Sequence, residues 1–286
     1  MIDIDRVNQY VSQFAEFIEN KTALRGAKQY FAGVDLGTSY MAVVVVDEHG
    51  KPAAGALRFA EVVRDGLVVD YVGAVRVVKE LKKEIEELLD TELEVAAVAY
   101  PPGTGGKNRD AFGYVAEGAG FECVRDLDEP TAANLVLQVD NGAIVDIGGG
   151  TTGVAILKDG EVVHTGDQPT GGTHFSLVIA GAYKIPFAEA EERKKDPALQ
   201  RELFPVVKPV MEKVSLIIEK ECQMSGQPIE EIYLCGGTSA FSKIEKVIAN
   251  RTGCSVVKAA YPWLVTPAGI ALACREAILN GYQGND

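Results

Sequence analysis

The sequence is poor in cysteine and histidine, and both shortages exclude classes of protein. Its five cysteines, among 286 residues, are widely scattered and show no Cys-x-x-Cys spacing; they stand at positions 123, 222, 235, 254 and 274. This usage predicts reduced thiols of an intracellular protein and argues against a disulfide scaffold. The three histidines, at 49, 164 and 174, show no metal-ligand spacing either, so we expect no zinc site.

Basic residues and long apolar runs are also scarce. Lys and Arg number 28 against 41 Asp and Glu, which gives a net charge of −13 and opposes binding to polyanions. We therefore expect neither a nucleic acid nor an anionic membrane as a partner. No uninterrupted apolar run reaches the roughly 18 residues of a membrane-spanning helix, and the acidic N-terminal stretch is unlike a signal peptide. We expect a cytoplasmic protein.

What the sequence does contain is a glycine-rich segment, Val145–Val154, that predicts two strands joined by a turn. Successive glycines allow several backbone N–H groups to converge on one anion. Asp146 ends the first strand, and its carboxylate would repel a phosphate unless a hard cation such as Mg²⁺ lay between them. The segment therefore predicts a metal–nucleotide site, whose other members are Gly148, Gly149, Gly150, Thr151 and Thr152. An ordinary glycine-rich turn with a solvated Asp is the alternative for this segment alone.

The same pattern occurs about a hundred residues earlier, a spacing that indicates a duplicated domain. In Val34–Ser39 an apolar strand, an Asp, an apolar residue, a Gly and two hydroxyl residues follow in the same order. In both copies a polar turn containing glycine then leads to a further strand. Two such hairpins facing one cleft would hold a polyphosphate from both sides, with Asp35, Gly37, Thr38 and Ser39 contributed by the earlier copy.

Strands and helices alternate along the rest of the chain, which predicts an α/β fold. We expect an N-terminal amphipathic helix within residues 1–29, a first lobe over 30–139 that is completed by 262–286, and a second lobe over 140–261. The N-terminal helix either packs on its own body or binds a partner.

The later helices have recognisable starts and breaks. Residues 188–204 and 206–224 are predicted as two helices separated at Pro205, and Thr266 is predicted to cap a C-terminal helix of small residues. Glu129 stands between Asp128 and Pro130, which suits the start of a helix, where a carboxylate caps free N–H groups. Capping is therefore the structural explanation for Glu129.

A second pair of glycines, Gly236 and Gly237, follows a buried strand. Glycines would let a flat ring or a ribose lie close to the backbone there. Close packing within the protein explains the pair equally well.

Five segments, taken in order, resemble those of the actin-like ATPase superfamily, which includes actin, sugar kinases, MreB, PilM and the DnaK-type chaperones. They correspond to its first phosphate loop, first connecting helix, second phosphate loop, adenosine loop and second connecting helix, and they are Gly33–Ser39, Asp128–Ala133, Val145–Thr152, Leu234–Ser239 and Ala268–Ala273. The resemblance implies two ribonuclease-H-like lobes with a nucleotide cleft between them and minimal accessory subdomains. It also implies ATP or ADP and Mg²⁺ as ligands.

The resemblance implies a role for each candidate residue. Asp35 and Asp146 would hold Mg²⁺ and its waters, and Glu129 would orient or deprotonate the attacking water. The phosphates would be held by Gly37, Thr38, Ser39, Gly148, Gly149, Gly150, Thr151 and Thr152, and the adenosine would be bordered by Gly236, Gly237 and Phe241. No lysine matches the phosphate-contacting lysine of DnaK-type members, so we expect slow ATP hydrolysis or none.

Four other stretches resemble a chaperone-like subgroup that is encoded with ethanolamine-utilisation enzymes and their microcompartment; they are Val62–Gly66, Gly73–Val75, Pro101–Thr104 and Val206–Val210. This resemblance implies an ATP-dependent switch that acts on those enzymes or on microcompartment proteins, free in the cytoplasm or associated with the microcompartment. An actin-like filament or scaffold is the alternative. A small-molecule kinase ranks third, because only Asp167 lies near the second loop and the rest of a sugar pocket is missing.

Overall fold

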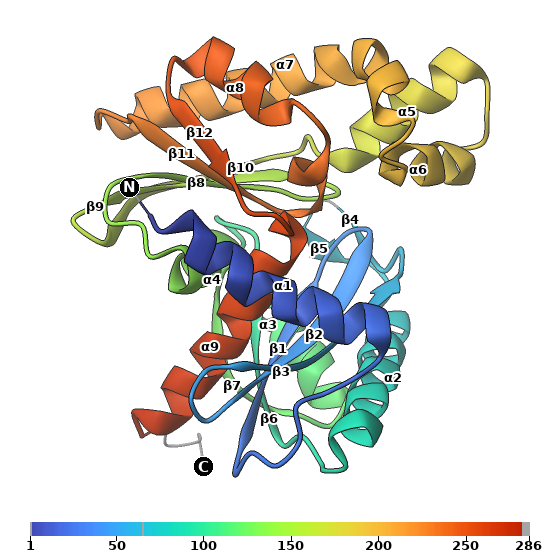
Figure 1. Cartoon of the computed structure of the whole chain (residues 1–286), viewed down its shortest axis with the longest axis vertical. Helices are drawn as coiled ribbons and strands as arrows, with labels where there is room; N and C mark the ends of the chain where they lie inside the picture. The colour runs from blue at the N-terminus through green and yellow to red at the C-terminus, as the bar shows by residue number, and fades with distance from the viewer. Residues whose placement is uncertain (1, 65, 282–286) are drawn as a thin grey trace. The chain divides into compact units, whose positions relative to one another are not determined.

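The computed structural model describes residues 2–64 and 66–281; of the stretches discussed above, Asp65 and residues 282–286 lie outside this description. The chain divides into two compact units. The central unit is Val139–Lys258, and the terminal unit is Ile2–Gln138 together with the stretch from Ala259 onward. Each unit contains one five-stranded sheet (Figure 1).

The sheet of the terminal unit is built from the apolar segments of the first half of the sequence. Its strands lie in the order β3 (Pro52–Phe59), β2 (Tyr40–Asp47), β1 (Tyr30–Leu36), β6 (Val95–Tyr100) and β7 (Glu122–Asp128). β1 is antiparallel to β2 and parallel to β6, which is parallel to β7. Parallel neighbours need crossover connections, and α2 (Tyr71–Leu89) and α3 (Lys107–Gly118) provide them. The carboxyl ends of β1, β6 and β7 therefore lie at one edge of the sheet.

Helices cover both faces of this sheet, because successive side chains of a strand point to opposite sides. Ala32 and Val34 of β1 belong to the apolar cluster lined by α2 and α3. A Cβ on Gly33, between them, would instead overlap the backbone of α9 (Val265–Leu279). α9 thus packs on the opposite face, where it also contacts α4 (Glu129–Leu137). A short hairpin of β4 (Val63–Arg64) and β5 (Leu67–Val68) completes the unit.

The start of α9 differs from the prediction. A short 3₁₀ helix, Pro262–Leu264, precedes α9, and the α-helix begins at Val265 with Leu264 at the N-cap position. Thr266 is therefore not the cap, because the chain is already helical when it reaches this residue. Pro267 lies in the first turn of the helix, where its missing N–H costs no intrahelical hydrogen bond.

The N-terminal helix α1 (Ile4–Asn20) packs on its own unit. Val7, Val11 and Phe14 are fully buried, and α1 lies against β3. The Arg6 guanidinium donates to the carbonyl of Val136 at 2.8 Å, and the Tyr10 hydroxyl donates to the carbonyl of Gly50 at 2.8 Å. These contacts favour the packing interpretation of this helix over a detachable partner-binding segment.

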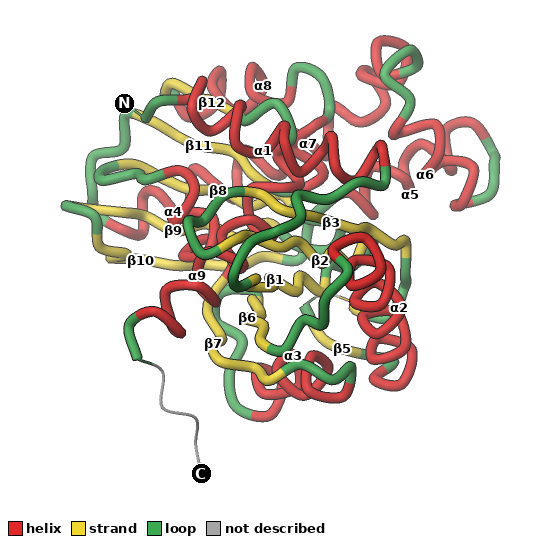
Figure 2. The backbone as a smooth tube through the Cα atoms, turned by 60° about the horizontal axis from the view of Figure 1, so that its bottom comes forward, coloured by secondary structure: helices red, strands yellow, loops and turns green. Residues whose placement is uncertain are grey.

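The central unit repeats the strand order of the terminal unit. Its strands are β10 (Glu161–Gln168), β9 (Thr152–Lys158), β8 (Gly142–Ile147), β11 (Glu231–Cys235) and β12 (Ser255–Lys258). β8 is antiparallel to β9 and parallel to β11, and β11 is parallel to β12. The strands of the two sheets can be followed in Figure 2. The matching topology confirms the predicted α/β fold and its internal duplication.

The α-helices of the central unit are α5 (Gly172–Tyr183), α6 (Phe187–Lys195), α7 (Gln200–Ser225) and α8 (Ile244–Thr252) (Figure 1). A short 3₁₀ helix, Gly237–Ala240, follows β11. The predicted break at Pro205 is wrong, because α7 runs through both Pro205 and Pro209. An interior proline costs about 3 kcal/mol, but the buried side chains continue at helical spacing past both prolines, at Leu203, Val207, Val210, Met211 and Val214. Burial of this face keeps the helix intact, and the break falls between α6 and α7 instead.

Over the described residues, no helix is long and apolar enough to cross a membrane. All five cysteines are free thiols, as predicted. Burial raises the pKa of the Cys222 and Cys274 thiols to about 12, so both stay protonated and unreactive at neutral pH.

Candidate nucleotide-binding site

Asp146 lies at the end of β8, beside the end of β11, and is 7% exposed. The neighbouring Cys235 thiol lies 3.6 Å from the Asp146 carboxylate. Gly236, which follows Cys235, has a φ of +83°, and a Cβ there would overlap the Asp146 carboxylate and lie 2.6 Å from the Ile147 carbonyl oxygen. Only glycine satisfies both demands. The predicted adenosine loop is therefore packed directly on the carboxylate of the predicted phosphate loop.

The carbonyls of the phosphate loop are held from one side. The Gly148 carbonyl accepts hydrogen bonds from the Gly172 N–H at 3.0 Å and from the Thr238 hydroxyl at 2.7 Å. The Gly149 carbonyl accepts from the Thr173 N–H at 2.8 Å. The first turn of α5 and the turn after β11 thus fix two successive peptide planes.

Fixing these carbonyls also fixes the direction of the next N–H groups. In a trans peptide the C=O and the following N–H point in opposite directions, so the N–H groups of Gly149 and Gly150 point away from α5. Within residues 2–64 and 66–281, neither N–H has a hydrogen-bond acceptor. Two adjacent N–H groups that point the same way and have no acceptor are a donor pair of the kind that can bind an anion.

Two glycines that the sequence reasoning missed make this arrangement possible. A Cβ on Gly171 would lie 2.6 Å from the Gly148 carbonyl oxygen and 2.8 Å from that of Gly149. A Cβ on Gly172 would overlap the Thr238 hydroxyl. The Gly-Gly pair at the start of α5 was a visible signal, because paired glycines before a helix often mark a close approach between backbones.

Two predicted ligand contacts do not agree with the structure. Thr152 is fully buried, and its hydroxyl donates to the Thr170 carbonyl at 2.6 Å, so it is not placed to hold a phosphate. Phe241 is 3% exposed and packs edge-to-face on Phe175 in the core, so its ring is not available to an adenine. Thr151, in contrast, is partly exposed.

In the terminal unit the first hairpin places Asp35 near the end of β1, and Gly37–Ser39 form the turn to β2. A Cβ on Gly37 would lie 2.5 Å from the Tyr40 carbonyl oxygen, which explains the glycine. Glu129 follows β7, whose carboxyl end lies at the same sheet edge as that of β1.

The helix cap at this edge is Asp128 rather than Glu129. The Asp128 carboxylate accepts from the Thr131 N–H at 3.0 Å and from the Thr131 hydroxyl at 2.7 Å. Glu129 is the first helical residue of α4. Capping therefore does not account for Glu129.

Asp167 is the acidic group that sequence reasoning left out of the site. It lies on β10 and accepts a hydrogen bond from Thr151. Burial, and then the charges of Asp146 and Glu221, raise the pKa of the Asp167 carboxyl to about 6, although the Thr151 hydrogen bond opposes the rise. Glu221 itself is engaged by His164, whose ring nitrogen lies 2.8 Å from it.

Replacement of Asp167 by asparagine is expected to stabilise the ligand-free protein at pH 8. The folded-state pKa of about 6 exceeds the unfolded value of roughly 3.9, so the folded state binds more protons in this window. Stability therefore falls as pH rises from about 4 to about 6, and the ionised carboxylate destabilises the fold above that range. The gain in Asp167→Asn is on the order of 1 kcal/mol, after allowance for partial exposure.

Urea unfolding at pH 4 and pH 8 measures this effect. The two proteins are expected to converge at pH 4, where both side chains are neutral. A variant less stable than the natural protein at pH 8 would contradict the prediction.

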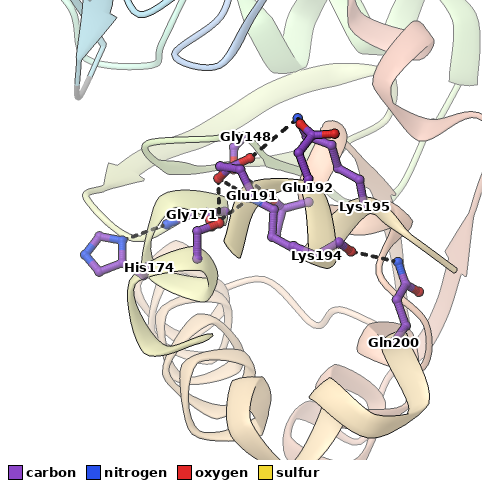
Figure 3. A network of polar contacts seen from close by, with 11 residues as sticks. Gly148, Gly171, His174, Glu191, Glu192, Lys194, Lys195 and Gln200 are labelled. Atoms are coloured by element: carbon purple, nitrogen blue, oxygen red, sulfur yellow. Dashed lines mark hydrogen bonds and ion pairs between the residues drawn. The ribbon is translucent and has the colours of Figure 1, made fainter. Parts of the chain in front are cut away.

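A buried ion pair on α6 contacts the segment that holds the phosphate loop (Figure 3). The Lys194 ammonium on α6 lies 2.6 Å from the Glu191 carboxylate and donates to the Gly172 carbonyl at 3.0 Å. The Ser176 hydroxyl donates to the same Glu191 oxygen at 2.5 Å. Burial lowers the pKa of Lys194, while the charge of Glu191 opposes this shift. The network ties α6 to the first turn of α5, which holds the loop carbonyls.

The donor set fits a hydrated magnesium–phosphate ligand better than a cage made by the protein alone. In the described residues no group of three or more His, Cys, Asp and Glu side chains is arranged to hold a metal ion. Mg²⁺ is commonly held by one or two carboxylates, several waters and the phosphates of its nucleotide. The Asp146 carboxylate, whose Oδ1 atom would lie 4.0 Å from a Cβ on Gly148, and the donor pair that follows in the same loop match that requirement.

Comparison with known proteins gives the family. The model for the type IV pilus assembly protein PilM matches residues 114–262. The ethanolamine utilization protein EutJ of Salmonella typhimurium is 41% identical over 239 residues, which cover 84% of this chain and 83% of that protein. The chain belongs to the EutJ family. The crystal structure of EutJ from Carboxydothermus hydrogenoformans matches with a TM-score of 0.90 at 46% identity, over 94% of this chain and 99% of that one.

The chain is also similar to chaperones. A homologue of the chaperone HscA from Pseudomonas paraeruginosa is 33% identical over 256 residues. The match covers 73% of this EutJ-family chain but 41% of the chaperone. Together with the PilM match, it confirms the resemblance to the actin-like ATPase superfamily, and the EutJ matches confirm the ethanolamine-utilisation subgroup.

Proposed function

We propose that the protein is an Mg·ATP-binding switch that assists ethanolamine-utilisation enzymes or microcompartment proteins, as the name of its EutJ relatives suggests. The observation that carries this proposal is the pair of N–H groups at Gly149 and Gly150, which point away from α5 and have no acceptor within the described residues, in the loop that follows Asp146. Anion donors and a carboxylate side by side suit a phosphate that arrives with its own cation. The HscA relatives support the chaperone-like part of the proposal.

The roles follow from the chemistry of the groups. In the central unit Asp146 would hold Mg²⁺ through its waters, and the glycine N–H groups of the loop would bind phosphate oxygens. In the terminal unit Asp35 and the Gly37–Ser39 turn offer the same kinds of group. Gly236 and Gly237 would border the adenosine. Magnesium would supply positive charge between the carboxylates and the phosphates. Glu129 would orient the attacking water if ATP is hydrolysed.

A bound γ-phosphate would act as the switch. Contacts that form only with ATP would favour one conformation, and their loss would release it, because a ligand shifts an equilibrium only through differential affinity. Client capture that differs between ATP and ADP would be the functional readout.

Saturating Mg·ATP is expected to raise the melting temperature of the natural protein by roughly 5–10 °C. A ligand at about 100 times its dissociation constant stabilises the folded state by ~2.7 kcal/mol, and a chain of this size gains roughly 2–4 °C per kcal/mol. In Asp146→Ala the rise should disappear, whereas in Asp159→Ala, at an exposed turn of the same sheet, it should persist. An absent shift in the natural protein with every nucleotide would exclude the switch.

A further inference from the structure

Asp167 stands in strand register with Gly153. The two residues pair across the antiparallel strands β10 and β9, and paired residues present their side chains on the same face of a sheet. Gly153 contributes no side chain there. The Asp167 side chain therefore lies next to the start of β9. This is the point where the phosphate loop ends.

One oxygen of Asp167 has no partner. Its Oδ1 atom is buried and makes no hydrogen bond within the described residues, while Thr151 donates to the carboxylate. A buried oxygen without a donor costs roughly 1–3 kcal/mol, more when it is charged. Unsatisfied buried groups are rare in native proteins, and each calls for an explanation such as an ion or a water.

The neighbouring groups do not supply the missing donor. Glu221 is an acceptor itself and is engaged by His164 and by Gln168, at 2.8 and 3.5 Å. Asp146, whose charge also acts on Asp167, is another carboxylate. The charges of Asp146 and, more weakly, Glu221 both act on Asp167, and an excess of negative charge around a carboxylate favours the arrival of a cation.

We propose that Asp167, next to the phosphate loop, is a second cation-binding residue of this site. Its buried Oδ1 atom accepts a hydrogen bond from a water that is bound to the Mg²⁺ ion of the nucleotide. This inference rests on the proposed function. Two carboxylates, Asp146 and Asp167, suit Mg²⁺, which keeps several waters and the phosphate oxygens as ligands. Thr151, bonded to Asp167, links this carboxylate to the loop that binds the phosphates.

The test measures the affinity for a non-hydrolysable ATP analogue with saturating MgCl₂ and with EDTA. For the natural protein Mg²⁺ should tighten binding. In Asp167→Asn this enhancement should fall about tenfold, as is usual when a group that orients a metal's ligands is removed. Binding with EDTA should stay the same or tighten, because a negative charge near the phosphates is gone. Asp159→Asn, which removes a charge from an exposed turn of the same sheet, should behave like the natural protein.

The stability of the variant separates a cation-binding role from a structural one. Asp167→Asn should be at least as stable as the natural protein without ligand, although it has lost its response to Mg²⁺, and Asp167→Glu should restore part of that response. An unchanged Mg²⁺ enhancement in Asp167→Asn, or a variant that loses stability along with affinity, would overturn the inference while leaving the proposed function in place. A natural protein that does not bind the analogue at all would overturn both.

Discussion

Replacement of Gly269 by alanine is expected to destabilise the terminal unit by at least about 3 kcal/mol, the upper range for overpacking a well-packed interior. A Cβ on Gly269 would overlap the backbone carbonyl of Ala132 on α4. Backbone atoms inside a helix have no alternative rotamer, so α9 and α4 would have to move apart. A loss of this size corresponds to a melting temperature lower by roughly 6–12 °C.

The displacement also reaches the residues of the terminal unit that are predicted to bind the nucleotide. α4 begins at Glu129, and α9 packs against β1, which carries Asp35. Gly33 on β1 adds a second point where a Cβ would overlap the α9 backbone. Separation of these elements should therefore weaken the response to Mg·ATP in whatever fraction of the variant stays folded.

Gly181→Ala is the matched control. Gly181 lies within α5, and a Cβ there would have no neighbour within 4 Å. Alanine in an open helical position gains roughly 0.5–1 kcal/mol over glycine, so this variant should melt slightly higher than the natural protein. Circular-dichroism melting compares the three proteins. A Gly269→Ala protein that melts within about 2 °C of the natural one would show that α4 and α9 are not in close contact.

The features that could be predicted from the sequence are those carried by short, local patterns. Each of the two predicted phosphate-binding hairpins can be recognised by an Asp at a strand end that is followed by glycine and hydroxyl residues. The repeat of that order predicts two equivalent sheets. The small residues predicted for the C-terminal helix allow the close packing that is seen at Gly269 and Gly33. In these cases the residues that matter lie within one turn or one helix face.

Two of the predicted contacts depend on tertiary packing that local spacing does not contain. A row of hydroxyl residues after glycines suits a phosphate, but β9 begins at Thr152, and the Thr152 hydroxyl bonds the Thr170 carbonyl of the neighbouring segment instead. Phe241 follows the predicted adenosine loop, which suggests a contact with adenine. Its ring packs against Phe175 in the core instead.

The role of Asp167 could not be predicted from the sequence for a different reason. Its importance depends on Thr151, Gly153 and Asp146, which become its neighbours only through the pairing of β10 with β9 and of β9 with β8. Lys194 and Glu191 are similar, because nothing in a charged helical stretch distinguishes a buried ion pair from a solvated face. Long-range pairing and helix packing decide which charges are buried, and neither is encoded in local spacing.

The buried pair gives the second large effect. In Lys194→Met the free energy of unfolding is expected to fall by about 3 kcal/mol, the low end of the range for breaking a buried ion pair. The Glu191 side chain is 4% exposed, so its charge would remain in the interior with one fewer partner. Lys195, 3.9 Å away and 31% exposed, compensates only in part. The expected loss of unfolding free energy therefore lies at the low end of the range for buried ion pairs.

The loss of Lys194 should also loosen the phosphate loop. Its ammonium donates to the Gly172 carbonyl, and the Gly172 N–H holds the Gly148 carbonyl. A freer first turn of α5 would no longer direct the glycine N–H groups outward. The affinity for Mg·ATP should thus fall as well, beyond the loss explained by the unfolded fraction.

A double-mutant cycle separates the charge from the packing. Glu191→Leu combined with Lys194→Met removes both charges and should recover much of the stability, because replacement of a whole buried pair by apolar groups is often neutral. Lys208→Met, at an exposed pair with Glu212 on α7, is the control and should cost no more than about 1 kcal/mol. Urea unfolding of the four variants gives the coupling energy directly. If Lys194→Met and Glu191→Leu are additive, the two charges do not interact, and the loop is not held through this ion pair.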